Sequence, residues 1–351
     1  MGFLEKIFPK KGTAESVILI DIGADHLSGA YGRFQEKELP KLLYARTLPI
    51  EIRKDEAQER AMLRTLTILG NDLIREGAPI LARTTGTGSA DMILVSIDAP
   101  WQETTVRTEH LEQKKDFIFT KNLIAEKLKE ANVLPPEKFL ADESIIGTIL
   151  NGYETTNPYG KTARRAALVI LTSLIERTVA HAIIATLKEM YHTKNILPIA
   201  GNSLRFQALC DMFPHEQGAL IIDMTSKTLV SLALVRKGIL TVMHQKTTTA
   251  DAIGWTDTIT QTLSEIAKSY PLPRTIFLLA PESDLVSLRE KLGENKITQL
   301  WLSAHPPTII SIEKTLMTTF IQSVTTHMPD LSLLLMMEYY QNKHFISHHS
   351  H

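Results

Sequence analysis

Two apolar runs in this chain each end on an aspartate and then turn at once. Val17–Ile20 precedes Asp21, and Ala219–Ile222 precedes Asp223. Short apolar runs bounded by turn signals are typical of strands that are covered on both faces, so each run predicts a buried strand with one carboxylate at its end. A second apolar stretch follows each turn, which predicts two equivalent hairpins. Such a repeat indicates an internal duplication whose halves face each other across a ligand cleft.

Strand and helix patterns alternate through the rest of the chain, which predicts an α/β fold. The pattern at 55–83 indicates a long amphipathic helix, because its apolar residues recur at helical spacing. The predicted strands are residues 42–52, 92–97, 166–172, 196–199 and 275–280, and the predicted helices are residues 55–83, 120–132, 176–191, 203–212, 257–269, 284–292 and 331–342.

A length of 351 residues predicts two lobes, at roughly 100–200 residues for each domain. Residues 91–195 have a compact α+β pattern, and we expect them to form a small subdomain inserted between the two hairpins. The expected division is an N-terminal amphipathic segment and linker at 1–16, the first part of the first lobe at 17–90, the inserted subdomain at 91–195, the second lobe at 196–343 and a histidine-rich tail at 344–351. The last helix could return to the first lobe.

The amino-acid composition indicates which classes of protein and partner fit this chain. An apolar content of 44% and a charged content of 22% are typical of a globular protein. The net charge of −1 and the lack of a lysine and arginine cluster argue against nucleic acid as a partner. Cys210 is the only cysteine, which excludes an internal disulfide and favours a reducing, cytoplasmic setting. No apolar run reaches the roughly 18–20 residues of a membrane-spanning helix.

The N-terminal segment has an amphipathic pattern. Phe3, Leu4, Ile7 and Phe8 fall on one helical side, and three lysines lie nearby in the sequence. Such a segment can rest on an anionic membrane surface. The alternative is a frayed end docked on its own domain, because eight residues are too few for a stable isolated helix. The expected location is therefore the cytoplasm, with peripheral contact to the inner membrane as an open alternative.

The order of these pieces resembles the actin-like ATPase superfamily, and specifically its bacterial FtsA and PilM branch. Asp21-Ile22-Gly23 is similar to the first phosphate motif of that fold, and Asp223–Thr228 occupies the place of the second. Gly254–Ile259 resembles the stretch that opens a helix after the second hairpin. The resemblance implies a duplicated, ribonuclease-H-like fold of two lobes that flank a nucleotide.

The inserted subdomain resembles the FtsA type, since actin itself carries different insertions. Asn151–Glu154, Asn157–Gly160 and Leu168–Ile170 carry this likeness. The start of the chain, with Met1–Leu4 and Phe8–Lys11, looks more like PilM. The resemblance thus extends over nearly the whole chain, although each motif alone is loose.

The resemblance implies a site for ATP and Mg²⁺ between the two hairpins. Asp21 and Asp223 would hold a hydrated Mg²⁺ ion, while the alternative is that each only terminates a buried strand. Gln207, in the helix before the second hairpin, lies roughly where related enzymes place their water-orienting residue, with a solvated helix glutamine as the alternative. The implied nucleotide contacts are Gly23, Ala24, Thr225, Ser226, Thr228, Gly254, Ala280 and Pro281.

Several residues depart from the pattern of the family at this site. Thr225 and Ser226 stand where glycines would let the backbone approach phosphate, and a β-branched residue at positive φ costs about 1–2 kcal/mol. Pro281 removes a donor and Glu282 adds a charge in the adenosine segment, while Asp25 adds a carboxylate beside the first turn. Fewer donors and more carboxylates weaken both phosphate binding and phosphoryl transfer.

The sequence therefore leaves two alternative functions. The first is an adaptor or scaffold of FtsA or PilM type with weak or lost ATP hydrolysis. It would self-associate and dock on a protein partner at the cytoplasmic face of the inner membrane, in cell division or type IV pilus assembly. The second is an active actin-like ATPase that binds Mg-ATP and polymerises. A sugar-kinase-like phosphotransferase is disfavoured, because the inserted subdomain is of the FtsA type.

Overall fold

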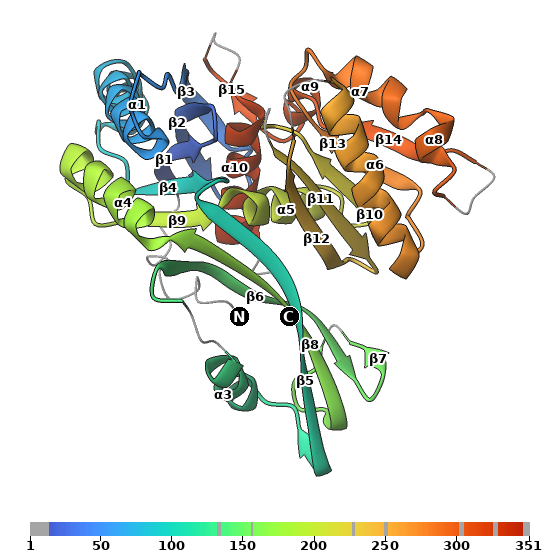
Figure 1. The fold of residues 1–351 in the computed structure, drawn as a ribbon. Coiled ribbons are helices and arrows are strands. Elements are labelled where there is room, and N and C mark those ends of the chain that lie inside the picture. Colours follow the sequence, from blue (N-terminus) through green and yellow to red (C-terminus); the bar gives the residue numbers. More distant parts are fainter. Residues whose placement is uncertain are drawn as a thin grey trace.

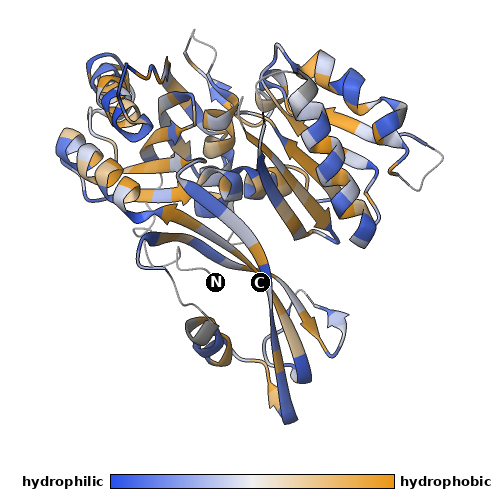
Figure 2. Cartoon of the chain, in the orientation of Figure 1, coloured by the Kyte–Doolittle hydropathy of each residue, from blue (hydrophilic) through white to orange (hydrophobic). Residues whose placement is uncertain are grey.

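Two lobes lie side by side in the computed structural model, and a smaller sheet extends away from them (Figure 1). The structure describes residues 14–131, 135–155, 157–226, 229–248, 252–301, 305–325 and 329–346. Hydrophilic residues are frequent along the outer helices and toward the far end of the smaller sheet, whereas hydrophobic segments follow the strands inside the lobes (Figure 2).

The first lobe is built on a six-stranded sheet in the order β15-β3-β2-β1-β4-β9. β1 pairs antiparallel with β2 and parallel with β4, so the first predicted hairpin is confirmed. Helices α1, α2 and α4 cover the outer face, and the helix predicted at 55–83 is α1 and α2 joined by a π-helical turn, η2. The elements are β1 (Ala14–Ile22), β2 (His26–Gln35), β3 (Lys41–Pro49), α1 (Gln58–Asp72), η2 (Leu73–Gly77), α2 (Ala78–Thr85), β4 (Met92–Ile97), α4 (Arg177–Tyr191), β9 (Ile196–Ala200) and β15 (Gln322–Ser323).

The second lobe repeats this plan in a five-stranded sheet of order β12-β11-β10-β13-β14. β10 pairs antiparallel with β11 and parallel with β13, which confirms the second predicted hairpin. Helices α6, α7 and α8 cover the outer face. The elements are β10 (Gly218–Asp223), β11 (Leu229–Arg236), β12 (Ile239–Thr247), α6 (Ala252–Ser269), β13 (Thr275–Leu279), α7 (Leu285–Leu292), α8 (Asn295–Thr298), β14 (Thr308–Ser311) and α9 (Lys314–Met317).

The period-two alternation of the two central strands decides where their aspartates point. Val17 and Leu19 of β1 belong to the core between the lobes, while Ile18 and Ile20 pack outward against α1 and α4. Successive side chains of a strand point to opposite faces, so Asp21 faces the other lobe. Ile221 of β10 is in the same inner core, which places Asp223 on the inner face as well. The two carboxylates therefore share the space between the lobes.

Two helices fill this space. α10 (Leu331–Gln341) is buried along its whole length and packs on α5 (Gly201–Met212), β1 and β2. A helix that is apolar on all sides needs cover on all sides, and the two lobes supply it. The Gln341 amide donates hydrogen bonds to the carbonyl oxygens of Gln35 and Glu38, both at 3.2 Å. The last α-helix therefore lies against the first lobe (Figure 1).

The inserted subdomain is smaller than the sequence predicted. Its sheet has the order β5-β8-β6-β7, and the division at 91–195 is wrong at both ends. β4 is hydrogen-bonded to β1 and β9, and α4 packs on the outer face of the first lobe, so both belong to that lobe. The elements of the subdomain are β5 (Gln102–Ile118), α3 (Lys121–Ala131), β6 (Lys138–Leu150), β7 (Tyr153–Glu154) and β8 (Thr162–Glu176).

The predictions for the two chain ends fall largely outside the described residues. These ends are residues 1–13 and 347–351, while η3 (Asn342–Ile346) continues α10. Among the helices that the structure describes, none combines the length and the apolar character that crossing a membrane requires.

Candidate site between the lobes

An arginine that the sequence did not single out lies between the two hairpin aspartates. Arg205 projects from α5, and only 5% of it is exposed. Its Nε donates to Asp223 Oδ2 at 2.6 Å, while Nη1 and Nη2 donate to the two carboxylate oxygens of Asp98, both at 2.9 Å. Nη2 also donates to Asn202 Oδ1 at 2.7 Å. The guanidinium thus joins the end of β10 in the second lobe to the residue after β4 in the first.

The ionisation of Arg205 follows from these partners. Burial alone would lower the pKa of its guanidinium, but the charges of Asp223 and Asp98 outweigh burial and raise the pKa well above the ordinary value. The side chain is therefore a permanent cation. Charge-assisted, two-pronged arginine–carboxylate pairs are among the stronger hydrogen-bonded contacts in proteins.

Glycine is required where α5 begins, beside this ion network. A Cβ added at Gly201 would collide with the Asp98 carboxylate and approach the Ser96 hydroxyl within 2.9 Å. The backbone of α5 therefore lies directly against Asp98, and the close approach fixes the point from which Arg205 reaches both lobes.

Asp21 lies beside the network without joining it. Its side chain is 1% exposed, and Oδ1 has no hydrogen-bond partner among the described residues. Burial and, to a smaller extent, the negative charge of Asp98 raise the pKa of this carboxyl, Arg205 partly offsets both effects, and the resulting pKa is about 7. Near neutral pH the Asp21 carboxyl is therefore divided between its neutral and charged forms.

The two phosphate-type turns are occupied by contacts within the chain. In the first turn, Gly23 N donates to the carbonyl of His26 at 3.0 Å, and the Ala24 carbonyl accepts from the Gln58 amide at 3.1 Å. In the second, Thr225 donates from both its backbone N and its Oγ1 to Asp223 Oδ1, at 3.0 and 2.7 Å. Both oxygens of Asp223 therefore already accept hydrogen bonds.

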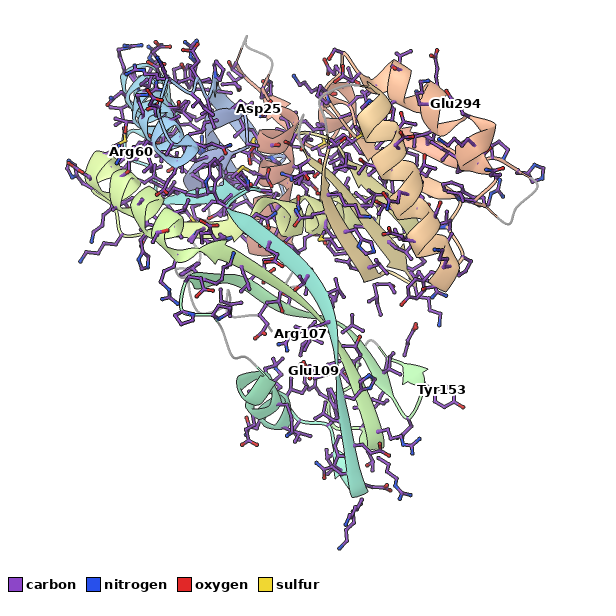
Figure 3. The ribbon with its side chains drawn as sticks, in the orientation of Figure 1. Asp25, Arg60, Arg107, Glu109, Tyr153 and Glu294 are labelled. Atoms are coloured by element: carbon purple, nitrogen blue, oxygen red, sulfur yellow. The ribbon has the colours of Figure 1, made fainter. Side chains whose placement is uncertain are left out.

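A cavity of about 580 Å³ opens next to these turns. The predicted contacts Thr225, Ala280 and Pro281 line it, and Asp25, at its edge, lies where the first lobe faces the second (Figure 3). Among the described lining residues, the carboxylates are Asp25, Glu282 and Asp330 and the cationic side chains are His26 and Lys314. A nucleotide phosphate would thus meet more carboxylates than cations.

His26 is held by two of these carboxylates. Its Nδ1 lies 2.7 Å from Asp25 Oδ1, and its Nε2 lies 2.9 Å from Asp330 Oδ2. Burial opposes protonation of the ring, but the hydrogen bonds to Asp25 and Asp330 outweigh it and raise the pKa to about 11. The imidazolium charge is therefore neutralised locally and is not directed at a ligand.

The other predicted site residues lie elsewhere. Gln207 lies two residues after Arg205 on α5, and its amide donates to Ser203 Oγ, one turn earlier on the same helix, at 3.0 Å and to Asp142 Oδ2 of β6 in the inserted subdomain at 3.4 Å. Gly254 is in the first turn of α6, and its carbonyl accepts from Thr258 Oγ1. Ser226 follows Thr225 in the second turn. Thr228 lies outside the described residues.

The residues at the ends of the hairpins do not fit a Mg²⁺ ion shared by both aspartates. Both oxygens of Asp223 and both oxygens of Asp98 already accept hydrogen bonds, and the guanidinium of Arg205 is a fixed positive charge where the ion would lie. Mg²⁺ needs free carboxylate or phosphate oxygens, and a cation within the same cluster repels it. Among the described residues, no group of three or more aspartate, glutamate, histidine or cysteine side chains is placed so that it could hold a metal ion.

Comparison with known proteins identifies the fold. No family model matches the sequence, and no curated protein matches it. The chain resembles a structure of the PilM-PilN type IV pilus biogenesis complex with a TM-score of 0.61 at 12% identity, covering 95% of this chain and 99% of that one. A protein with an actin-like ATPase fold and unknown function from Bacteroides thetaiotaomicron VPI-5482 is similar with a TM-score of 0.44 at 10% identity. The match covers 92% of this chain and 95% of that one. The chain has a PilM-like, actin-like ATPase fold.

A further solved structure is also similar. The ethanolamine utilization protein EutJ from Carboxydothermus hydrogenoformans gives a TM-score of 0.41 at 10% identity, covering 96% of this chain and 93% of that one. At 12% identity, the similarity to the PilM-PilN structure establishes the fold but not the function. What the cleft of this actin-like chain can do depends on its own residues.

Asp98 and Arg205 are the residues of the actin-like cleft that sequence reasoning missed. Asp98 follows a predicted strand that, like β1, is apolar, and Arg205 is the one basic residue in α5. A charged residue in a helix that is otherwise buried nearly all round signals a buried partner of opposite charge. The burial of α5 and the origin of the partners in both lobes are visible only in the fold.

Proposed function

We propose that this chain is a scaffold or adaptor protein with the actin-like fold that has weak or lost ATP hydrolysis. The observation that carries the proposal is the pairing of Asp98 and Asp223 with Arg205. These two carboxylates would otherwise face a nucleotide and its metal, but here they bind Arg205 within the chain. The carboxylate-rich cavity beside it supports the same proposal. A chain with this cleft would act through its surfaces.

The proposed setting is the cytoplasmic face of the bacterial inner membrane, in type IV pilus assembly or cell division. The similarity to a structure of the PilM-PilN complex supports a protein partner there, and it favours the pilus setting over division. Self-association is part of the proposal, since actin-like scaffolds act as assemblies. Genomic neighbours of the coding sequence would separate the two settings.

Mg-ATP is expected to leave the thermal unfolding of the wild-type protein unchanged. A ligand that binds only the folded state at about 100 times its dissociation constant adds about 2.7 kcal/mol of stability, which a thermal scan detects. The measurement is the unfolding midpoint with and without saturating Mg-ATP, with release of inorganic phosphate measured on the same sample. A raised midpoint that Asp21→Ala with Asp223→Ala abolishes, together with phosphate release, would establish the rival function, an active ATPase that polymerises.

Membrane attachment is proposed to depend on residues 1–11, which lie outside the described residues and whose role rests on the sequence pattern alone. Sedimentation with anionic liposomes should pellet the full chain and leave a chain that lacks residues 1–11 in solution, because the apolar side and the lysines act together at such a surface. Neutral liposomes are the control. Equal pelleting of both proteins would reject the N-terminal anchor.

A further inference from the structure

Arg205 makes buried ionic contacts to both lobes, whose inner faces also share one hydrophobic core with α5 and α10. Its guanidinium contacts Asp98, which follows β4 in the first lobe, and Asp223, which ends β10 in the second. Asn202, one turn earlier on α5, accepts from Arg205 and donates to Ser231 Oγ of β11 at 3.4 Å. A single buried side chain and its helix therefore tie the ends of both central sheets together.

The negative charges of the carboxylates around Arg205 require a cation at this position. Asp21, Asp98 and Asp223 are all nearly buried, with exposures of 1%, 9% and 8%. Carboxylates brought together away from water need a compensating positive charge. A bound divalent cation is one way to supply it, and a guanidinium, whose planar fork matches carboxylate geometry, is another.

We propose that Arg205 is a built-in counter-ion that takes the place of a divalent cation between the two hairpins and holds the lobes together without nucleotide. The inference deepens the proposed function, on which it rests, because it names what keeps the cleft closed in a scaffold that does not cycle ATP. It also makes the Asp98 and Asp223 carboxylates a latent cation site that the arginine side chain fills. Removing the guanidinium while keeping the carboxylates should then create a binding site for a divalent cation.

The test is Mn²⁺ binding, measured by electron paramagnetic resonance, to the full-length wild-type and variant proteins. Arg205→Ala should bind Mn²⁺ at least about tenfold more tightly than the wild-type protein, because the vacated space is lined by buried carboxylates. Two controls define the site. Arg60→Ala removes an exposed helical arginine (Figure 3) and should bind like wild type. Arg205→Ala combined with Asp98→Asn and Asp223→Asn keeps the space, loses the carboxylates and should lose the gain in affinity.

Two results would overturn the inference. In the first, the Arg205→Ala variant binds Mn²⁺ no more tightly than the Arg60→Ala variant. In the second, the wild-type protein binds Mn²⁺ as tightly as the Arg205→Ala variant. Either leaves the scaffold function standing. Conversely, a wild-type protein that hydrolyses ATP would refute the scaffold function whatever Arg205→Ala binds.

A conservative variant covers the case in which Arg205→Ala does not fold. Arg205→Lys keeps the charge, but a compact ammonium cannot reproduce the fork that reaches both Asp98 and Asp223. Hydrogen exchange at the carboxyl ends of β1 and β10 should then be faster in Arg205→Lys than in wild type, while exchange in the inserted subdomain stays the same. Unchanged exchange at those strand ends would contradict the lobe-holding role.

Discussion

Replacing Arg205 with methionine is expected to lower the free energy of unfolding by about 3–5 kcal/mol, because the substitution leaves buried carboxylates without their cation. Methionine is similar in length and favours helix about as well as arginine, so the change isolates the charge and its hydrogen bonds. Urea unfolding at neutral pH measures the effect. Asp98 and Asp223 lose two hydrogen bonds and one hydrogen bond respectively, and their mutual repulsion is no longer compensated.

A triple variant separates the ion network from the packing of the side chain. Combining Arg205→Met with Asp98→Asn and Asp223→Asn removes the charges together, and replacing a whole buried ion cluster by neutral groups is often close to neutral in stability. The triple variant should therefore recover most of the lost free energy. Arg60→Met, in the exposed part of α1, is the matched control and should change stability by less than about 0.5 kcal/mol. A cost for Arg205→Met no larger than for Arg60→Met would show that the network contributes nothing.

Asp21→Asn is expected to stabilise the protein above neutral pH and to have little effect in acid. The pKa of Asp21 is about 7 in the folded chain against an ordinary value of 3.8, so the fold penalises its charged form. Between these two values the unfolded chain releases the proton and the folded chain keeps it. Stability is therefore lost as pH rises from about 4 to about 7, and the penalty is constant above that range.

Removing the ionisable group removes this penalty. The free energy of unfolding of Asp21→Asn should exceed that of the wild type by about 1–3 kcal/mol at pH 8, and the difference should shrink toward zero at about pH 3 and below, where Asp21 is largely neutral in both states. Thermal unfolding over this pH range measures the difference, with exposed Asp55→Asn as the control. An Asp21→Asn variant that is less stable than the wild type at pH 8 would contradict this expectation, because it would mean that Asp21 acts as a charged partner in the folded chain.

Much of the fold was predictable because buried strands appear in the sequence as short runs of apolar residues. The apolar runs before Asp21 and Asp223 became central strands, and alternation alone implies that both carboxylates face the same side. β5 was harder to predict. Its 17 residues include a polar stretch that pairs with β8 while remaining exposed to solvent, so this strand has no apolar pattern that predicts it. Polar strands of this kind are specified by the neighbouring strand more than by their own sequence.

The site was predictable only in part for a different reason. The sequence placed Asp21 and Asp223 on strand ends and identified α5 as a contributor, but it chose Gln207 where the fold uses Arg205. Nine of the twelve residues of α5 are buried, so no polar stripe shows which side faces the cleft. Asp98 likewise gains its role from the parallel pairing of β4 with β1, a contact between strands far apart in the chain. Contacts between residues this far apart in the chain cannot be predicted from the local sequence pattern.

A crystal structure of the wild-type protein grown with Mg-ATP would show whether Arg205 or a nucleotide and its metal occupies the space between the two hairpins. We expect the Arg205 guanidinium to remain bound to Asp98 and Asp223, with no phosphate or metal ion between the two hairpins. Density for Mg-ATP between those hairpins, with the guanidinium displaced from Asp98 and Asp223, would contradict this expectation.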